Sequence, residues 1–364
     1  MALDGLTPRD EADLSEALRG ADGPVVVRSG GTRAVGSTEG VSLDVSSLAG
    51  ISLYEPGAMT LVAGAGTSLA EIETALDAEN QRLAFEPMDH RVLLGTDGEP
   101  TLGGVYATNT SGPRRIQCGA MRDFALGIRF VDGVGTVVKN GGRVMKNVTG
   151  YDLVKMMAGT WGTLGVATEV SLKVLPKAEM MATVSVAISS VEEGVKALSA
   201  ALGSPFDVSG AAVLDDVAYV RIEGFAQSVA YRSGELKERL AGFGDVSVAS
   251  DPQLWADIRD VRCFADITGD IWKISVKPTD GPAVVAAIGG KAMMDWGGGL
   301  VWACVPAGTD VRGKLAGISG HATCVRGIGN GLVFPPADPA LTELIQGLRN
   351  RFDPKDILNR GLMG

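Results

Sequence analysis

Hydrophobic positions in the first half of the chain alternate between helical and strand spacing. Apolar residues recur every three or four positions from Pro8 to Leu18, which predicts a helix, and the run Val25–Val27 predicts a short buried strand. A second helix is expected to reach about Glu79, because Thr67 or Ser68 can cap its start. Further strands are predicted at 125–131, 136–139 and 166–175, with a helix at 152–158. This pattern predicts a mixed helix and sheet region.

The pattern changes after Pro176 into two successive units of strand, helix, strand, strand, helix and strand. The strands are expected at 183–188, 210–214, 218–222, 245–248, 271–276, 292–296, 300–305 and 320–325, and the helices at 191–202, 228–241, 282–288 and 311–316. Two split βαβ units of this kind predict an α+β fold with one antiparallel sheet and helices on one face. We therefore expect three parts: residues 1–176, residues 177–335, and a helix and tail at 336–364 that return to the first part.

Composition supports a globular protein and excludes several functions. The chain has 364 residues, 45% hydrophobic and 21% charged, which suits two or three domains. Its net charge of −10 disfavours binding to nucleic acid. The N-terminal stretch lacks a secretory pattern, and no run approaches a membrane span, so a cytoplasmic protein is expected.

Metal and disulfide chemistry are not expected. The four cysteines, at 118, 263, 304 and 324, have no zinc or iron–sulfur spacing. His90 and His321 are the only histidines, which excludes a site of three histidines, and no metal site is predicted.

Glycine is abundant, with 50 residues, about twice its ordinary usage, and no repeat period. Gly64-Ala65-Gly66 and Gly133-Val134-Gly135 lack the third glycine of a dinucleotide fingerprint. The segment 308–314 matches a phosphate-binding loop up to its lysine, but Leu315 occupies the position of the required hydroxyl. We interpret that match as coincidence.

Two other glycine segments have the chemistry of anion-binding loops. Arg28-Ser29-Gly30-Gly31-Thr32-Arg33 follows an apolar strand, and consecutive backbone N–H groups on such a loop suit a pyrophosphate, although a plain turn is an equal alternative. The second segment, 101–113, contains Gly103-Gly104 and the hydroxyl- and amide-rich run Thr108-Asn109-Thr110-Ser111-Gly112. Two such loops favour one nucleotide held between them.

These loops, with Met121–Gly127, Val144–Leu153 and Gly159–Val166, resemble the FAD-binding domain of the vanillyl-alcohol oxidase/p-cresol methylhydroxylase (PCMH) superfamily. Within it, the chain is most similar to the E subunits of bacterial glycolate oxidases, on Lys146–Leu153, Trp272–Val276, Gly320–Thr323 and the terminal Phe352–Gly361. The resemblance implies a PCMH-type FAD-binding domain of two subdomains, followed by a substrate or cap domain.

The resemblance also implies a set of cofactor contacts. FAD would be bound non-covalently, because covalent members carry a histidine where Thr32 stands. The implied FAD contacts are Ser29, Gly30, Gly31, Thr32, Thr101, Gly103, Gly104, Thr108, Ser111, Gly112, Arg122, Gly165, Val166 and Asn359.

Candidate catalytic groups follow from flavin chemistry, in which a hydroxy acid loses a proton to a base while its carboxylate is paired. His321 is the better candidate base, with a hydrogen-bonded core histidine as the equal alternative. His90 is interpreted as a surface or loop-ordering residue. Arg326 and Arg360 are the chosen carboxylate clamps, ahead of Arg115 and Arg122, which have the same fork geometry.

Electrons must leave the reduced flavin, and the chain has no haem or iron–sulfur motif. The resemblance implies a larger FAD subunit and an iron–sulfur subunit as partners, oxidation of glycolate to glyoxylate, and a cytoplasmic location, either free or at the inner membrane face through those partners. The alternatives are a self-sufficient oxidase or dehydrogenase of a hydroxy acid or lactone, and a non-catalytic assembly subunit. The segment Trp296–Trp302 is either a subunit contact or, as slightly preferred, strand core.

Overall fold

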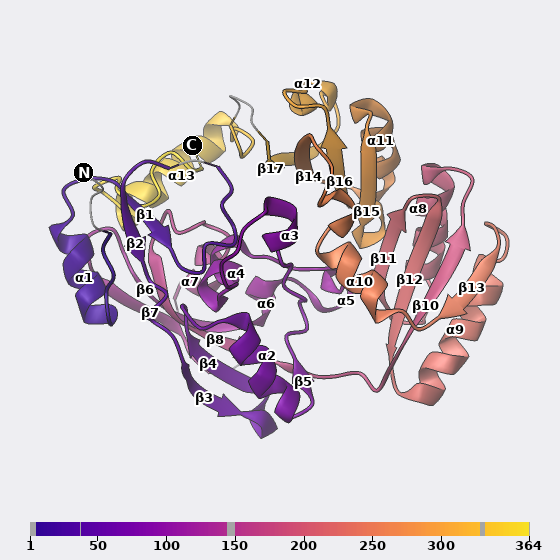
Figure 1. Ribbon diagram of the computed structural model, residues 1–364, viewed down its shortest axis with the longest axis horizontal. Coiled ribbons are helices and arrows are strands. Elements are labelled where there is room, and N and C mark those ends of the chain that lie inside the picture. The colour runs from indigo at the N-terminus through magenta and orange to yellow at the C-terminus, as the bar shows by residue number, and fades with distance from the viewer. Residues whose placement is uncertain (1–4, 37, 144–149, 328–331, 364) are drawn as a thin grey trace.

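The computed structural model describes residues 5–36, 38–143, 150–327 and 332–363, and it contains two large β-sheets at opposite ends of the molecule (Figure 1). One sheet is built from strands between residues 51 and 173, and the other from strands between 180 and 326. Both chain ends lie on the side of the first sheet (Figure 1). The motif segment 144–149 lies outside the described residues.

The first sheet has five strands in the order β3-β4-β8-β6-β7, and each neighbouring pair is antiparallel. Leu61, Phe85 and Phe130 are fully buried in the core between this sheet and its helices. The strands are β3 (Ile51–Glu55), β4 (Thr60–Gly64), β6 (Ala125–Val131), β7 (Val137–Gly141) and β8 (Val166–Lys173), and the helices are α2 (Leu69–Ala78), α4 (Leu102–Thr108), α6 (Met121–Phe124) and α7 (Leu153–Met157).

A small parallel pair, β1 (Val25–Arg28) and β2 (Val41–Asp44), lies beside this sheet with α1 (Glu11–Gly20). The chain returns to this pair after α13 (Pro339–Phe352). Val25 N–H donates to Ile357 O at 2.8 Å, and Asn359 N–H donates to Val25 O at 3.0 Å. The C-terminal segment therefore completes the first half of the molecule.

The second sheet has eight strands in the order β13-β10-β12-β11-β15-β16-β14-β17, with antiparallel neighbours throughout. Each predicted unit contributes four adjacent strands, and the units join where β11 pairs with β15, so the prediction of two split βαβ units is confirmed. The first unit is β10 (Met180–Ala187), α8 (Val191–Leu202), β11 (Val208–Leu214), β12 (Val217–Gly224), α9 (Ala226–Leu240) and β13 (Val246–Ala249); the second is β14 (Asp270–Val276), α11 (Gly281–Ile288), β15 (Lys291–Asp295), β16 (Leu300–Val305), α12 (Val311–Lys314) and β17 (Gly320–Arg326).

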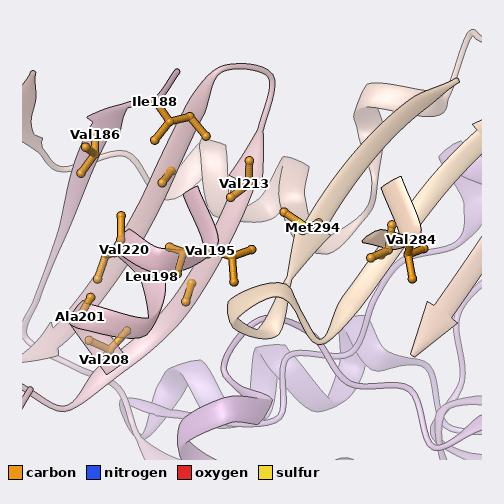
Figure 2. Packing of buried hydrophobic residues seen from close by; sticks show 14 of the residues in the cluster. Val186, Ile188, Val195, Leu198, Ala201, Val208, Val213, Val220, Val284 and Met294 are labelled. Carbon is orange, nitrogen blue, oxygen red and sulfur yellow. The ribbon is translucent and has the colours of Figure 1, made fainter. Parts of the chain in front are cut away.

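The two faces of this sheet have different neighbours. Helices α8, α9, α11 and α12 cover one face, where Val195, Leu198 and Val220 pack in an apolar core (Figure 2). The other face turns toward the first half, and Trp302 on β16 packs there with Met88. Helix α10 (Pro252–Arg259), which the sequence pattern did not predict, and α3 (Arg91–Leu94) fill the space between the halves. The junction therefore brings residues far apart in sequence together.

A cluster of buried ion pairs fixes the two halves to each other. Arg114, which precedes α5 (Arg115–Cys118), contacts Glu86 at 3.0 Å and Glu223 of β12 at 2.8 Å. Arg221 of β12 contacts Glu86 at 2.8 Å, and Arg82 of β5 (Gln81–Arg82) contacts Glu223 at 2.7 Å. Arg221 also lies 3.6 Å from Glu223, so each carboxylate has cations from both halves of the molecule.

Other predictions about the chain have clear outcomes. Leu300–Val305 is buried at every position, so the strand-core interpretation of the 296–302 segment is confirmed for its second half. Asp310 caps α12 by accepting from Gly313 N–H, which gives the apparent phosphate-loop match a structural role. All four cysteines are free. Remaining short elements are β9 (Leu175–Pro176) and the 3₁₀ turns η1 (Pro56–Ala58), η2 (Arg262–Phe264), η3 (Pro278–Asp280) and η4 (Trp296–Gly298).

Among the residues that the structure describes, no helix combines the length and the apolar character needed to cross a bilayer. Nor do their His, Cys, Asp and Glu side chains gather in threes around a point where a metal ion could bind.

Candidate functional site

The first glycine loop touches residues 98–99, which lead into the second glycine loop. A Cβ atom on Gly30 would lie 1.5 Å from Glu99 O, and one on Gly98 would lie 1.7 Å from Gly30 O. The backbones can approach this closely only because neither residue has a side chain. Gly31 has a φ of 69° with open space where a side chain would project, so its amide edge borders a hollow instead of a neighbour.

A cavity of about 410 Å³, here called the loop cavity, lies between the two loops. Ser29 Oγ and Arg33 Nε are buried at its wall without a hydrogen-bond partner among the described residues. Burial lowers the pKa of Arg33 to about 10, and the charge of Asp89 opposes that shift. Buried donors without acceptors are costly unless a ligand pairs with them, so this wall is suited to an anionic or carbonyl-rich group.

A second cavity of about 100 Å³, the apolar cavity, shares Val27, Ser29, Gly104 and Trp161 with the loop cavity. Its remaining wall is mainly apolar, formed by Val45, Ala65, Ile128, Phe130, Met157 and Val166. The two spaces together make a polar compartment continuous with an apolar one, which suits a ligand that joins phosphates to flat rings.

Asn359 holds the boundary between these compartments. Its side-chain Oδ1 accepts from Val27 N–H at 2.8 Å, and its Nδ2 donates to Trp161 O at 2.7 Å. The backbone φ of 43° at Asn359 is a left-handed conformation that asparagine tolerates better than most residues. This one side chain therefore joins β1, the 159–165 loop and the C-terminal segment.

A third cavity, of about 140 Å³, lies between the two halves and is here called the junction cavity. Val35, Thr108 and Trp161 line both this cavity and the loop cavity, so the two spaces share a wall. Its floor comes from the second sheet, where Lys273 of β14 pairs in register with Thr323 of β17. Because side chains two apart on a strand share a face, the neighbouring pair Ser275 and His321 lies on the same surface.

The junction cavity is electropositive. Lys273 Nζ lies 5.7 Å from the ring centre of Trp296 and 5.8 Å from that of Trp302, and no carboxylate pairs with it among the described residues. Burial, together with the charge of Arg115, lowers the pKa of Lys273 to about 8. Burial and the charges of Lys273 and Arg115 also lower the pKa of His321. The Lys273 ammonium, which has no carboxylate partner among the described residues, favours binding of a carboxylate in this small cavity.

Most of the predicted cofactor residues come together. Eleven line the loop cavity or the apolar cavity: Ser29, Gly30, Gly31, Thr32, Thr101, Gly103, Gly104, Thr108, Gly165, Val166 and Asn359. Three others lie elsewhere. Ser111 Oγ accepts from Met121 N–H at 2.9 Å, Gly112 packs against Glu86, and Arg122 is exposed near the start of α6. Ser111 and Gly112 border a smaller space behind the junction cavity.

The predicted catalytic residues divide differently. His321 lines the junction cavity. Arg326, predicted as a carboxylate clamp, instead donates to the main-chain carbonyls of Leu93, Phe264, Ala265 and Ile267, which occupies its guanidinium in holding loops together. Arg360, the other predicted clamp, is exposed and pairs with Asp356 at 2.9 Å. The structure therefore corrects both arginine predictions.

Three site residues were missed or misread in the sequence. His90, interpreted as a surface or loop-ordering residue, is only 8% exposed, and its Nδ1 has no partner among the described residues. Lys273 lies in a strand that resembles the family, and the alternation Trp272-Lys273-Ile274-Ser275 is the signal that puts Lys273 and Ser275 on one face. The sequence pattern places Arg33 at the end of the first glycine loop but predicts no role for its side chain. Its burial follows from long-range packing that no local pattern reports.

Comparisons with known proteins give the family. The FAD binding domain family matches residues 6–141. The chain is 33% identical over 344 residues to the glycolate oxidase subunit GlcE of Escherichia coli (strain K12), covering 93% of this chain and 92% of that protein. The chain belongs to the GlcE family. Family membership over nearly the whole length means that both halves, and not the nucleotide loops alone, have counterparts in GlcE.

Other relatives match over shorter stretches. The D-lactate dehydrogenase of Archaeoglobus fulgidus is 28% identical over 52% of this chain and 42% of its own length. The glycolate oxidase subunit GlcD of Bacillus subtilis (strain 168) is 24% identical over 61% of this chain and 47% of its own length. A structure of alkyldihydroxyacetonephosphate synthase superposes with a TM-score of 0.70 at 16% identity, over 98% of this chain and 76% of that chain, which shows the shared fold. The PCMH-type FAD-binding fold expected for this GlcE-family protein is confirmed.

The residues present fit FAD, the cofactor of this GlcE-family chain. The two glycine loops and the orphaned Ser29 hydroxyl suit the pyrophosphate. The apolar cavity suits the flat rings of the cofactor. The Arg33 guanidinium, at the wall of the loop cavity, suits a polar ring edge. FAD bound by these residues would supply a hydride acceptor.

Proposed function

We propose that this chain is the FAD-binding subunit of a glycolate oxidase complex and takes part in oxidising glycolate, a 2-hydroxy acid, to glyoxylate. The observation that supports this most is the junction cavity, which shares Val35, Thr108 and Trp161 with the loop cavity and presents Lys273 and His321. A small, electropositive space beside the cofactor suits a short carboxylate whose carbinol carbon must face a hydride acceptor.

Each side chain of the junction cavity then has a role. Lys273 holds the substrate carboxylate, because its ammonium has no competing anion among the described residues and lies between two indole rings. Ser275 and Thr323 offer hydroxyl groups on the same sheet face. Trp161, Trp302 and Phe334 exclude water from the other walls. The cavity volume of about 140 Å³ favours a small hydroxy acid over a sugar.

We further propose that FAD is held without a covalent bond, since Thr32, not histidine, stands at the position that covalent relatives use. The parts that would cooperate are residues 1–176 for FAD, 177–335 for the substrate cap, and 336–364 as the returning tail. The hydrogen bonds from Val25 and Asn359 support the third assignment.

Assembly with a larger FAD subunit and an iron–sulfur subunit completes this proposal, with electrons passing to those partners and the complex at the inner face of the membrane. Support comes from α13, which has apolar residues at positions i, i+3, i+4 and i+7. These are Leu341, Leu344, Ile345 and Leu348, which are 52%, 66%, 43% and 38% exposed. An exposed apolar helix face of this kind is typical of a contact surface for another protein. We propose that another subunit of the oxidase covers it.

One experiment tests the core of the proposal. The purified chain is examined by absorbance, acid-precipitated, and in a separate sample titrated anaerobically with glycolate and with D-lactate. We expect a flavin spectrum, flavin released into the acid supernatant, and bleaching by glycolate. Flavin that stays with the precipitate contradicts non-covalent binding, and a flavin that no hydroxy acid bleaches, even with the partner subunits added, contradicts the proposed role.

A further inference from the structure

A small cavity of about 20 Å³, here called the inner cavity, lies behind the junction cavity. The two cavities share four lining residues, so these side chains form the wall between them. They are His90, Thr110, Lys273 and Trp302. Asp295 lines the inner cavity but not the junction cavity. The volume is enough for one water molecule, and the polar lining supplies the two to four partners that a buried water needs.

Asp295 is a buried carboxyl group at the N-terminus of the η4 turn. It ends β15, is 3% exposed, and its Oδ1 accepts from Trp296 N–H at 2.7 Å. Among the described residues no cation forms an ion pair with it. Burial raises the pKa of Asp295 to about 7, against the Trp296 hydrogen bond and the charge of Arg221, while the charge of Glu86 adds to the rise. This carboxyl group can therefore take up a proton near neutral pH.

His90 stands between the two cavities. Its ring is buried, and its Nδ1 lacks a hydrogen-bond partner among the described residues. Burial, with the charges of Arg33 and Lys273, holds the pKa of His90 well below 6.5, so the imidazole is neutral at physiological pH. A proton accepted by this ring would not stay, because the imidazolium would lie near two cations in a poorly solvated space.

We propose that Asp295 is the final acceptor of the proton released by the substrate hydroxyl, reached from the junction cavity through His90 and one water molecule in the inner cavity. This inference rests on the proposed function. The substrate O–H bond breaks and its proton passes to one nitrogen of His90, while the C–H bond gives its electron pair to bound FAD and the C=O bond forms. The other nitrogen of His90 releases a proton to the water, and the water gives one to the Asp295 carboxylate.

This route assigns the base to His90 and not to His321. His321 is exposed where it lines the junction cavity, whereas His90 is buried and lines both the junction cavity and the inner cavity. Proton transfer to Asp295 also removes a negative charge from the core and leaves Lys273 with its charge for the product carboxylate. Proton transfer through His90 to Asp295, here called the relay, thus leaves the charge of Lys273, which holds the carboxylate, unchanged through the reaction.

The test uses infrared difference spectra of the FAD-loaded protein, recorded before and after anaerobic reduction by glycolate. We expect a new carbonyl band of a protonated carboxylic acid that shifts in D₂O. Asp295→Asn should abolish the band, because the amide oxygen still accepts from Trp296 N–H but cannot take up a proton. Asp353→Asn is the matched control: Asp353 is equally buried and its pKa is also raised by burial, but it lies outside the inner cavity. That variant should keep the band.

A second variant keeps the test independent of the folding of Asp295→Asn. His90→Gln should lose the band and reduce flavin about 100-fold more slowly, in the range expected for loss of a proton acceptor. Wild-type protein that is reduced by glycolate without the band, or His90→Gln protein that keeps it, overturns the relay alone. Wild-type flavin that glycolate never reduces overturns the relay together with the proposed function.

Discussion

Arg114 donates from Nε to Glu223 Oε2 at 2.8 Å, across the boundary between the two halves of the molecule. Both side chains are under 10% exposed, and Arg114 also donates to the main-chain oxygen of Ala84. Burial alone would raise the pKa of Glu223, but the hydrogen bond from Arg114 and the charges of Arg221, Arg114 and Arg82 hold it well below its usual range. The pair therefore fixes the cap against the FAD-binding half.

Replacing Arg114 with Met should lower the free energy of unfolding by about 3–5 kcal/mol, because two buried carboxylates lose a cation each. Urea unfolding followed by circular dichroism measures this. Arg129→Met, which breaks the partly exposed pair with Glu11, is the matched control and should cost under about 1 kcal/mol. An equal loss of unfolding free energy in the two variants would contradict a stabilising role for the cluster of buried ion pairs.

The same cluster predicts a pH dependence of stability. The pKa values of Glu86 and Glu223 are lower in the folded chain than in the unfolded one, so their contribution is complete above about pH 4.3 and is lost as the pH falls through the folded values. Denaturation midpoints in urea should therefore be steady near neutral pH and drop steeply below about pH 4. Glu223→Gln should flatten that drop while lowering stability at pH 7.

Gly30→Ala should abolish FAD retention, because its Cβ would lie 1.5 Å from Glu99 O and push the first loop away from the segment that leads into the second loop. The flavin-to-protein ratio after gel filtration measures the loss. Gly234→Ala is the control, since that glycine lies in α9 with open space around it and alanine favours helix. Full flavin content in Gly30→Ala protein would show that this contact is not required.

Lys273→Met should weaken binding of oxalate, an unreactive carboxylate, by about 10–100-fold, the cost of losing a charged hydrogen bond. Perturbation of the flavin spectrum reports the Kd. Since only the ammonium form attracts the anion and its pKa is about 8, wild-type affinity should decline as the pH rises through 8, while the variant shows no such decline. Lys277→Met, at an exposed lysine just after the same strand, should bind oxalate as the wild type does.

Leu344→Asp should prevent assembly with the partner subunits and leave the flavin content unchanged, because α13 exposes this side chain away from the cofactor cavities. Co-purification of the subunits with a tag on this chain measures assembly. Gln346→Glu, on another face of the same helix, should assemble normally. Assembly of the Leu344→Asp chain would place the subunit contact elsewhere.

Local patterns were enough for the second sheet and for the glycine loops. The strand β16 and helix α8 have the predicted bounds, because alternation and capping are encoded within a few residues. The role of Arg326 was not accessible in this way, since its carbonyl acceptors at 93 and 264–267 are remote in sequence or lie in irregular loops. His90 was misread for the same reason: its neighbours Asp89 and Arg91 are polar, but packing from the second half buries the ring.

The position of Asn359 has a consequence for when the cofactor can be loaded. Both glycine loops leave the ribosome more than 200 residues before this side chain, which then bridges Val27 and Trp161. A nascent chain that ends before residue 359 lacks the hydrogen bonds that join Val27 to Trp161 through Asn359 at the wall of the loop cavity. Flavin capture is therefore a late event in biosynthesis, and truncated translation products should emerge colourless.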